Sequence, residues 1–401
     1  MQDLLKYLNS YKSILIWGFG LEGHSTYNFL SKHLSNVRIT IADANIPKDL
    51  PSNVEFVKSS VPLDALASHD LVIKSPGISL YNCKIKPNTF PITSQTELSL
   101  RFYKNQIIGI TGTKGKSTTA TLMHLMLLDA DKKSVLVGNI GQPVFDVLSS
   151  IEIDTYLVYE LSAHQLDNVH FSPHISILLN LYQEHLDYYE TVEDYFEAKK
   201  QIFRHQNEND FFFDKEVMNN KIINSDWKIP LSVHLLTVQA MLCVADILNI
   251  NEKSIRNAVE SFNGLEHRLE LVGEYNGISY YNDSISTAVE STLFALEKVP
   301  NIQTFIMGGD DRGIDYLPLA NELKKSNIKL VITMFNSGKV LNKLLQNLGI
   351  ELFHTDDFDE ALKKSYKNVL FSPASASYGS FKNFIQRGEK FKEAVIRKNK
   401  S

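Results

Sequence analysis

Short, mostly apolar runs alternate with glycine turns and helical stretches along the first hundred residues. Strands are predicted over Ser13–Trp17, Val37–Ala42 and Asp70–Lys74, because each run is short and rich in residues that prefer a buried sheet. A helix is predicted over His24–Ser35. This alternation of strand and helix is typical of a parallel sheet covered by helices, whose ligands lie at the carboxyl ends of the strands.

The same alternation continues in a second block that begins near Leu98. Around residue 200 the period becomes helical, while Asn207–Ile229 is polar and is predicted to be irregular. The predicted strands are Ile107–Ile110, Ser134–Val137, Thr155–Glu160 and Ile175–Leu179, and the predicted helices are Thr118–Leu128, Thr191–His205, Leu231–Leu248 and Glu252–Ser261.

A third block of the same kind follows from about Leu269, with strands predicted over Gly277–Asn282, Thr304–Met307, Leu330–Thr333 and Val369–Phe371 and a helix at the C-terminus. We therefore predict an α/β protein with three domains. Their predicted bounds are 1–97 for a Rossmann-like domain, 98–268 for a P-loop ATPase-type domain, and 269–401 for a second Rossmann-like domain.

Composition narrows the possible partners. The 401 residues are 43% hydrophobic, which supports real cores and excludes wholesale disorder. The net charge of -5 gives no support for a nucleic-acid partner. No apolar run is long enough for a membrane span, and two distant cysteines, Cys83 and Cys243, fit a reducing compartment. We expect a cytoplasmic protein, a monomer, without membrane insertion.

The clearest candidate for chemistry follows the strand at Ile107. Gly112-Thr-Lys-Gly-Lys-Ser117 joins that strand to a helix, so its backbone N–H groups and the helix N-terminus favour a bound phosphate. Lys116 is placed to reach the outer phosphates, and the Ser117 hydroxyl is a candidate Mg²⁺ ligand. Ile110 occupies the first glycine position of the strict P-loop template, so an ordinary strand-to-helix turn stays a second interpretation.

Three further residues in the second block carry candidate chemistry. Glu160 ends an apolar strand at the expected ligand edge, where a carboxylate is a suitable ligand for Mg²⁺. His185 follows the next strand and is equally consistent with a metal ligand and with a structural loop histidine. Lys199 lies on a predicted helix, and by itself an exposed lysine is the simpler interpretation.

The other two blocks also place polar residues at strand ends. Gly18-Phe-Gly20-Leu-Glu-Gly23 with Asp43 fits a dinucleotide pattern, which mononucleotide sites share, so we do not infer NAD. In the third block Tyr281–Ser284, Gly308–Gly313 and Ser372–Ser377 each follow a strand. Together they predict a rim for a small ligand, with Arg312 suited to a carboxylate.

Taken together, these motifs resemble the Mur ligase family. The matching motifs, in order along the chain, are Gly112–Thr118, Gly138–Gly141, Glu160–Gln165, His185–Asp187, Ala198–Lys199, His267–Arg268, Asn282–Ser284, Gly308–Asp310 and Ser372–Gly388. The resemblance implies an ATP-dependent ligase that adds D-glutamate to UDP-N-acetylmuramoyl-L-alanine through an acyl phosphate. It also implies Mg²⁺, with two ions, and a carbamylated Lys199.

The resemblance further implies a role for each matched residue. The UDP moiety would contact Gly20, Leu21, Glu22, Asp43, Ser75 and Gly77. ATP would contact Gly112, Thr113, Gly115, Lys116, Ser117, Thr118, Arg268 and Asp283. The metal ligands would be Ser117, Glu160, His185 and Lys199; the catalytic residues would be Lys116, His185, Lys199 and Asn139. D-Glutamate would contact Thr287, Arg312, Ser377 and Phe384.

The chain departs from this family in a few places. The family usually has asparagines after the histidine aligned with His234, whereas this chain has Leu235 to Val238; the segment between Lys199 and His234 is short, and Ile285 replaces a lysine that some members carry. Two alternatives therefore stay open. One is a related ligase for a different amino acid, and the other is a UDP-substrate-binding regulatory protein with a degenerate ATP site.

Overall fold

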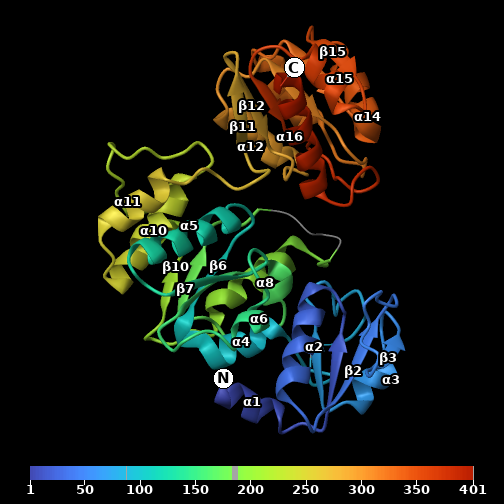
Figure 1. The fold of residues 1–401 in the computed structure, drawn as a ribbon, viewed down its shortest axis with the longest axis vertical. Helices are drawn as coiled ribbons and strands as arrows, with labels where there is room; N and C mark the ends of the chain where they lie inside the picture. Colours follow the sequence, from blue (N-terminus) through green and yellow to red (C-terminus); the bar gives the residue numbers. More distant parts are fainter. Residues whose placement is uncertain (87, 183–187, 401) are drawn as a thin grey trace. The chain divides into compact units, whose positions relative to one another are not determined.

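The computed structural model describes residues 1–86, 88–182 and 188–400. These residues form three largely parallel sheets with helices between the strands (Figure 1), which confirms the α/β prediction. Their contacts divide the chain into two compact units. Unit 1 comprises Met1–Lys228 and His234–Ser261, and unit 2 comprises Ile229–Val233 and Phe262–Ser401. The bounds 1–97, 98–268 and 269–401 stay a prediction.

The first sheet of unit 1 is parallel, in the order β3-β2-β1-β4-β5, so its strand order reverses beside β1. In such sheets ligands bind outside the carboxyl ends, where the order reverses. Its strands are β1 Ser13–Trp17, β2 Arg38–Asp43, β3 Glu55–Lys58, β4 Leu71–Lys74 and β5 Ile92–Thr93. The neighbouring helices are α1 Gln2–Leu8, α2 Leu21–His33, α3 Leu63–Ser68 and α4 Gln95–Tyr103.

Helix α2 begins at Leu21, three residues before the predicted start at His24. Gly20 is its N-cap and has an extended backbone. The glycine motif therefore contains the first turn of the helix, and its N–H groups face the carboxyl edge of β1. The predicted start at His24 was wrong because glycine disfavours the interior of a helix, so the glycine motif was placed outside the helix. Glycine is tolerated at the N-cap, where the helix begins.

The second sheet of unit 1 is also parallel, in the order β10-β9-β6-β8-β7, so the strand before the phosphate loop is central. Its strands are β6 Ile107–Thr111, β7 Ser134–Gly138, β8 Tyr156–Glu160, β9 Ile175–Leu178 and β10 Phe211–Phe213. The other elements are a 3-10 turn at Lys104–Gln106 and the helices α5 Lys116–Asp129, α6 Val144–Val147, α7 Ala163–Leu166, α8 Val192–Arg204, α9 Lys215–Asn219, α10 Leu235–Leu248 and α11 Glu252–Glu260.

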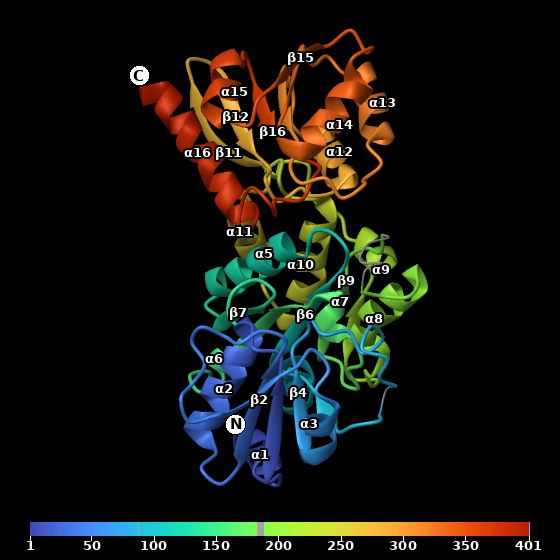
Figure 2. The ribbon, with the colours of Figure 1, turned by 90° about the vertical axis from the view of Figure 1, so that its right-hand side faces the viewer.

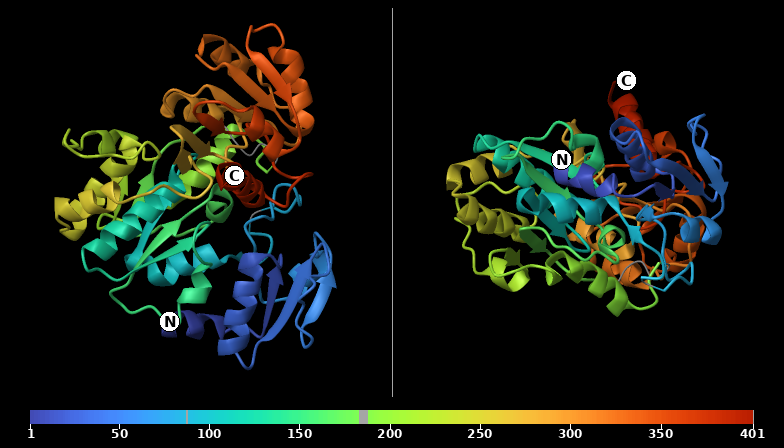
Figure 3. Two further views of the ribbon diagram at one scale, coloured as in Figure 1. Left: turned by 45° about the horizontal axis from the view of Figure 1, so that its top comes forward. Right: turned by 90° about the horizontal axis from the view of Figure 1, so that it is seen from below.

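Two predictions for this block were wrong. The stretch 207–229 contains β10, which pairs with β9, and α9, which the Asp214 side chain caps. Helix α10 begins at Leu235 rather than Leu231, because His234 accepts a hydrogen bond from the Leu236 amide and caps the helix. Helices α10 and α11 pack against α5 (Figure 3).

Apolar packing joins the first two sheets into one unit. A continuous cluster of buried side chains runs from the helices of the first sheet to those of the second. Phe29 of α2 lies against Phe145 of α6, with ring centroids 4.6 Å apart. Burial of two aromatic rings of this size is worth several kcal/mol, so this contact stabilises the junction.

Unit 2 holds a six-stranded sheet in the order β11-β12-β16-β13-β14-β15, with β11 antiparallel to β12 through an Asn276-Gly277 turn. Figure 2 shows α12, α13 and α14 on one face of this sheet, with α15 and α16 on the other. The strands are β11 Glu270–Tyr275, β12 Ile278–Asn282, β13 Thr304–Met307, β14 Leu330–Thr333, β15 Glu351–His354 and β16 Val369–Phe371. The helices are α12 Val289–Lys298, α13 Leu317–Lys325, α14 Phe335–Leu345, α15 Phe358–Lys364 and α16 Phe384–Lys400.

Candidate active site

The loop between β6 and α5 has the geometry of a phosphate-binding loop. Gly115 caps α5 with a left-handed backbone (φ +86°), which glycine adopts without a steric penalty. Helix α5 begins at Lys116, so Lys116 and Ser117 both lie in its first turn, and Thr118 behind them is buried. The first N–H groups of a helix have no partner within the helix and attract an anion.

Asn180, which the sequence analysis did not single out, holds this loop from the neighbouring strand. Its Oδ1 accepts hydrogen bonds from the amides of Thr113 (3.1 Å) and Lys114 (2.8 Å), and its Nδ2 donates to the Lys114 carbonyl at 3.0 Å. The Thr113 hydroxyl lies 3.2 Å from the Tyr195 hydroxyl. These hydrogen bonds fix the conformation of the loop. The signal in the sequence was the polar Asn180 directly after an apolar strand.

Two lysines meet at one carbonyl of the loop. Lys116 Nζ donates to the carbonyls of Gly112 (2.9 Å) and Thr113 (3.0 Å). Lys199 Nζ donates to the same Gly112 carbonyl at 2.8 Å, and it lies over the Tyr195 ring at 4.8 Å. Lys199 is buried, so the simpler interpretation of an exposed helix lysine was wrong. The fold brings Lys199 to the phosphate loop across 87 residues of chain.

Glu160 ends β8 beside the loop and is fully buried. Its Oε1 accepts a hydrogen bond from Asn139 Nδ2 at 3.2 Å, so these two predicted residues lie together. Its Oε2 is buried and accepts no hydrogen bond. A buried carboxylate oxygen without a donor is costly unless a cation meets it, so the residues present fit a hard cation such as Mg²⁺. His185 lies outside the described residues.

The predicted UDP-binding residues lie at the carboxyl edge of the first sheet. Asp43 at the end of β2 accepts hydrogen bonds from the amides of Phe19 (2.8 Å) and Asn45 (2.9 Å). The Ser75 hydroxyl donates to the Gly18 carbonyl at 2.8 Å, and Gly77 is exposed. Gly20 and Leu21 start α2 at the same edge. The structure therefore brings these residues together where the strand order reverses.

Glu22 lies differently from its neighbours. Its carboxylate turns toward the second sheet, where Oε1 accepts a hydrogen bond from Gln165 Nε2 at 2.8 Å. Burial raises the pKa of Glu22, while this hydrogen bond and the nearby Lys74 oppose the rise. One carboxylate oxygen of Glu22 is therefore engaged by Gln165.

Lys74 and Tyr188, which the sequence analysis did not single out, hold the Ser75–Ile78 turn. Lys74 Nζ donates to the carbonyls of Ile78 (2.8 Å) and Ser75 (3.3 Å), and the Tyr188 hydroxyl donates to those of Pro76 (3.0 Å) and Ile78 (2.9 Å). Burial lowers the pKa of Lys74, and the carboxylates of Asp167 and Glu22 oppose that shift. A lysine at the end of an otherwise apolar strand was the available signal.

In unit 2, three strand ends form one rim. The loops after β12, β16 and β13 follow adjacent strands, and hydrogen bonds join them: Ser372 Oγ donates to Asp283 Oδ2 (2.7 Å), and the Asp310 amide to the Ala376 carbonyl (2.8 Å). The predicted acceptor-binding residues all lie on this rim. Thr287 and Arg312 are exposed, with the Arg312 guanidinium 5.4 Å from the Tyr378 ring; Ser377 is buried, and Phe384 begins α16.

Asp283 is buried at the centre of this rim. Its Oδ1 accepts a hydrogen bond from the Leu269 amide at 3.1 Å, and its Oδ2 accepts the Ser372 hydroxyl. Burial raises the pKa of Asp283 to about 6, while its hydrogen bonds and the positive charge of Arg268 oppose the shift. In this structure its carboxylate joins loops within unit 2.

The pH dependence of unfolding tests the burial of Asp283. Because its pKa of about 6 exceeds the ordinary 3.8, stability from the protonated carboxyl is fully present below pH 3.8 and is lost as the pH rises through about 6. We expect Asp283→Asn, which stays neutral, to gain about 2–3 kcal/mol relative to wild type between about pH 4 and about pH 7.5. Urea unfolding at both pH values measures this gain, and a pH-independent difference would contradict it.

The segment that departs from the family pattern begins α10. The His234 Nδ1 accepts the Leu236 amide at 3.1 Å, so this ring is the helix cap. Leu235 is 56% exposed, whereas Val238 is fully buried in the helix packing. Val238 is therefore a core residue, and of these three residues only His234 and Leu235 are accessible to a nucleotide base.

One cluster in the described part of the chain has the spacing of a metal site. It comprises Glu266, His267 and Glu389 in unit 2. Lys392 Nζ already lies among these carboxylates, at 3.1 Å from Glu266 and 3.3 Å from Glu389, and at 3.0 Å from Glu270. The ammonium group supplies the positive charge that a metal would bring, so the cluster is an ion-pair network.

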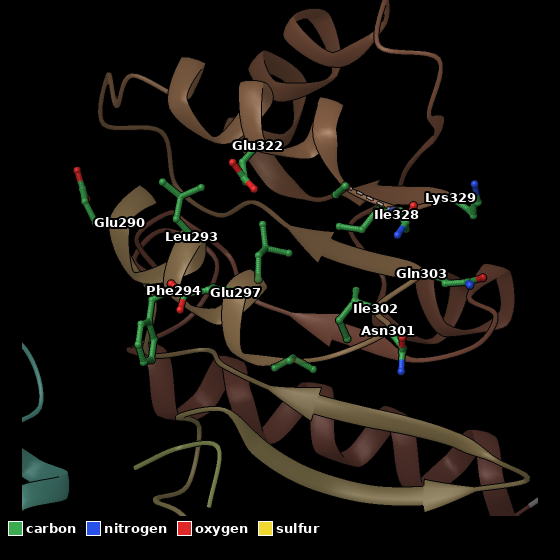
Figure 4. Close-up of a pocket in the computed structure, with 14 residues that line it drawn as sticks. Glu290, Leu293, Phe294, Glu297, Asn301, Ile302, Gln303, Glu322, Ile328 and Lys329 are labelled. Atoms are coloured by element: carbon green, nitrogen blue, oxygen red, sulfur yellow. Dashed lines mark hydrogen bonds between the residues drawn. The ribbon is translucent and has the colours of Figure 1, made fainter. Parts of the chain in front are cut away.

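A cavity of about 890 Å³ opens between α12 and α13 (Figure 4). It lies at the starts of β13 and β14, the edge of the sheet opposite the rim. Of its glutamates, Glu297 pairs with Lys298 (2.9 Å) and Glu322 with Lys325 (3.8 Å). These local pairs reduce its net charge, and none of the predicted site residues lines it.

Among the described residues, no helix is long and apolar enough to cross a membrane.

Two family profiles match the chain. A profile for the N-terminal domain of MurD-like Mur ligases matches residues 12–89, and a profile for the Mur ligase middle domain matches residues 110–282. The second range contains the phosphate loop, Glu160 and Lys199.

Curated relatives match almost the whole chain. The UDP-N-acetylmuramoylalanine–D-glutamate ligase of Bacillus cereus (strain G9842) is 31% identical over 96% of this chain and 97% of its own length. The enzyme of the same name from Staphylococcus saprophyticus is 30% identical over 95% of this chain and 96% of its own length.

Solved structures share the fold. The UDP-N-acetylmuramate-alanine ligase of Thermotoga maritima aligns with a TM-score of 0.58 at 18% identity, covering 97% of this chain and 100% of that one. The MurF ligase of the same organism, solved in complex with ADP, aligns with a TM-score of 0.56 at 16% identity over 99% and 100% of the two chains.

Proposed function

The chain belongs to the Mur ligase family, and we propose that it joins D-glutamate to UDP-N-acetylmuramoyl-L-alanine in an ATP-dependent step of peptidoglycan precursor synthesis. Full-length relatives at 30–31% identity carry this activity in their names. The observation that carries the proposal is the convergence of Lys116, Lys199 and Glu160 on one phosphate loop, because phosphoryl transfer needs positive charge and a metal ligand there.

The nucleotide and metal would occupy the loop after β6. We assign the phosphates of ATP to the backbone of Gly112–Gly115 and to Lys116, Ser117 and Thr118. Arg268 and Asp283 would also contact ATP, Asp283 through the ribose. Mg²⁺ would be held by Ser117 and Glu160, and a second ion by His185 and a carbamylated Lys199. When bound, the metal neutralises charge on the phosphates. The buried, unpartnered Oε2 of Glu160 supports this assignment.

The two substrates would bind at the two edges described above. The UDP moiety would lie against Gly20, Leu21, the backbone of Glu22, Asp43, Ser75 and Gly77. Asn139 and His185 would approach the muramoyl-alanine end. D-Glutamate would bind on the rim of unit 2, through Arg312, Ser377, Thr287 and Phe384. An arginine fork and a hydroxyl are suitable donors for two carboxylates.

The proposed chemistry follows from the poor reactivity of a carboxylate toward an amine. The alanine carboxylate attacks the γ-phosphorus of ATP, and ADP leaves, which creates an acyl phosphate. Lys116 stabilises the charge on the transferring phosphoryl group. The amine of D-glutamate then attacks the acyl carbon and loses a proton, and the tetrahedral intermediate expels phosphate. The protein mainly positions these groups and excludes water.

We also propose a cytoplasmic location. Cys83 and Cys243 are both free thiols, as a reducing compartment requires. The predicted monomer is untested and stays a prediction.

An assay of phosphate release tests the proposed function. We expect release by the purified protein to require ATP, Mg²⁺ and UDP-N-acetylmuramoyl-L-alanine, and to rise on addition of D-glutamate. A panel with L-glutamate, L-lysine and L-alanine separates the related ligases, and a preference for one of these would assign a different amino acid. Tight binding of the UDP substrate with no ATP affinity would favour the regulatory alternative, which the His234–Val238 segment motivates. No substrate-dependent release would contradict an active ligase.

A further inference from the structure

Arg387 is the largest charged side chain that is fully buried in the described part of unit 2. It lies in the first turn of α16, directly below the rim. Its guanidinium donates from Nε to the Ser284 hydroxyl (3.2 Å) and from Nη2 to the Ser284 carbonyl (2.8 Å). From Nη1 it donates to the carbonyls of Ser375 (2.9 Å) and Ala376 (3.0 Å).

These bonds join loops from separate strands. Ser284 follows β12, whereas Ser375 and Ala376 follow β16. The guanidinium contacts the loop after β13 by packing, because a Cβ atom on Gly309 would lie 2.8 Å from Nη1 and 2.3 Å from the Ala376 carbonyl oxygen. The Ser284 hydroxyl also donates to the Phe384 carbonyl at 2.8 Å. One guanidinium therefore contacts all the segments that carry the acceptor-binding residues.

The charge of Arg387 has no nearby counterion among the described residues. Its four hydrogen-bond acceptors are carbonyls and a hydroxyl, and none of the observed ion pairs includes it. Burial lowers the pKa of Arg387, with no carboxylate opposing the shift. An arginine keeps its proton at neutral pH even so. A buried positive charge below the rim attracts anions there, since the interior screens it weakly.

We propose that Arg387 positions the three loops that bind the acceptor amino acid, and that its buried charge favours a dicarboxylate acceptor over a neutral one. The inference rests on the proposed function, because it assigns the rim of unit 2 to D-glutamate. Arg387 does not touch the acceptor in this proposal and is a positioning residue. Its guanidinium fork holds the loops, and its charge acts through space.

Two substitutions separate the positioning of the loops by the Arg387 guanidinium from the effect of its positive charge. In Arg387→Lys the charge stays but the fork is lost, so we expect the KM for D-glutamate to rise about tenfold, with selectivity for D-glutamate over D-glutamine retained. In Arg387→Met both are lost, so we expect a larger rise in the KM for D-glutamate, about a hundredfold, together with about a tenfold fall in that selectivity. The first step can be measured without D-glutamate by trapping the acyl phosphate with hydroxylamine. We expect the rate of acyl-phosphate formation to change less than about threefold in either variant.

Arg397→Lys is the matched control, because Arg397 lies on the same helix and pairs with Asp359 at the surface. Ser284→Ala removes one acceptor and leaves the charge, and it keeps the test available if the Arg387 variants do not fold; we expect about a threefold rise in KM. An unchanged KM for D-glutamate would overturn the positioning role, and unchanged selectivity in Arg387→Met would overturn the role of charge. Inactive wild-type protein would instead contradict the proposed function.

Discussion

Replacing Glu160 by glutamine is expected to lower turnover by about 10²–10³-fold and to abolish stabilisation of the protein by Mg²⁺. Glu160 is fully buried beside the phosphate loop, and its Oε2 accepts no hydrogen bond. Glutamine keeps the shape and the acceptor for Asn139 but removes the negative charge that a hard cation requires. A ligand that binds only the folded state raises its stability, so loss of the ligand removes that rise.

The midpoint of thermal unfolding, measured with EDTA, with Mg²⁺ and with Mg²⁺ plus ADP, reports Mg²⁺ binding separately from activity. Glu152→Gln is the control, because Glu152 pairs with Lys133 at the surface and lies in the same part of the chain. Mg²⁺ plus ADP should raise the unfolding midpoint of the wild type and of the control equally, and it should leave the unfolding midpoint of Glu160→Gln unchanged. A Glu160→Gln protein with normal turnover and a normal Mg²⁺ shift would remove Glu160 from the metal site.

Replacing Lys199 by methionine is expected to cost about 10³-fold in turnover and to remove a carbamate from the protein. Lys199 and Lys116 both donate to the Gly112 carbonyl, so two ammonium groups lie close together. Like charges at such separation repel. In the proposed carbamylation, the neutral amine of Lys199 would attack carbon dioxide; an N–C bond would form, a proton would leave to solvent and the positive group would become an anion. The repulsion then becomes an attraction.

Carbon-13 NMR after incubation with labelled bicarbonate detects the carbamate directly. We expect a carbamate signal from the wild type and none from Lys199→Met. Lys200→Met is the matched control, since Lys200 is the next residue and pairs with Glu197 at the surface; it should keep both the signal and the activity. Full activity without any signal would show that an unmodified Lys199 suffices.

The strands that the hydrophobic pattern predicted lie in the interior of their sheets, with the exception of the edge strand β7. β1, β13, β14 and β16 have the predicted bounds, and all are fully buried. The missed strands are β3, β5, β10, β11 and β15, and all five lie at sheet edges. An edge strand is partly exposed, so it needs no continuous apolar run. Its pairing with a neighbour makes it a strand, and that neighbour lies elsewhere in the sequence.

The candidate site divides in a similar way. The phosphate loop, Glu160 and the three rim loops were predictable because each is a short segment after a buried strand, and parallel strands bring their carboxyl ends to one edge. The role of Lys199 at the loop could not be derived from its helix alone. Asn180 and Arg387 were missed because their hydrogen bonds join distant segments, as from Arg387 to Ser284 across 103 residues.

The sequence by itself therefore determined the α/β class, the phosphate loop and the order of the motifs, because these depend on residues close together in the chain. Only the tertiary structure decided which lysines meet at Gly112, where the Glu22 carboxylate turns and which arginine supports the rim. Those contacts depend on burial and on partners far away in sequence. A charged side chain inside a protein takes its role from whatever neighbours compensate its desolvation.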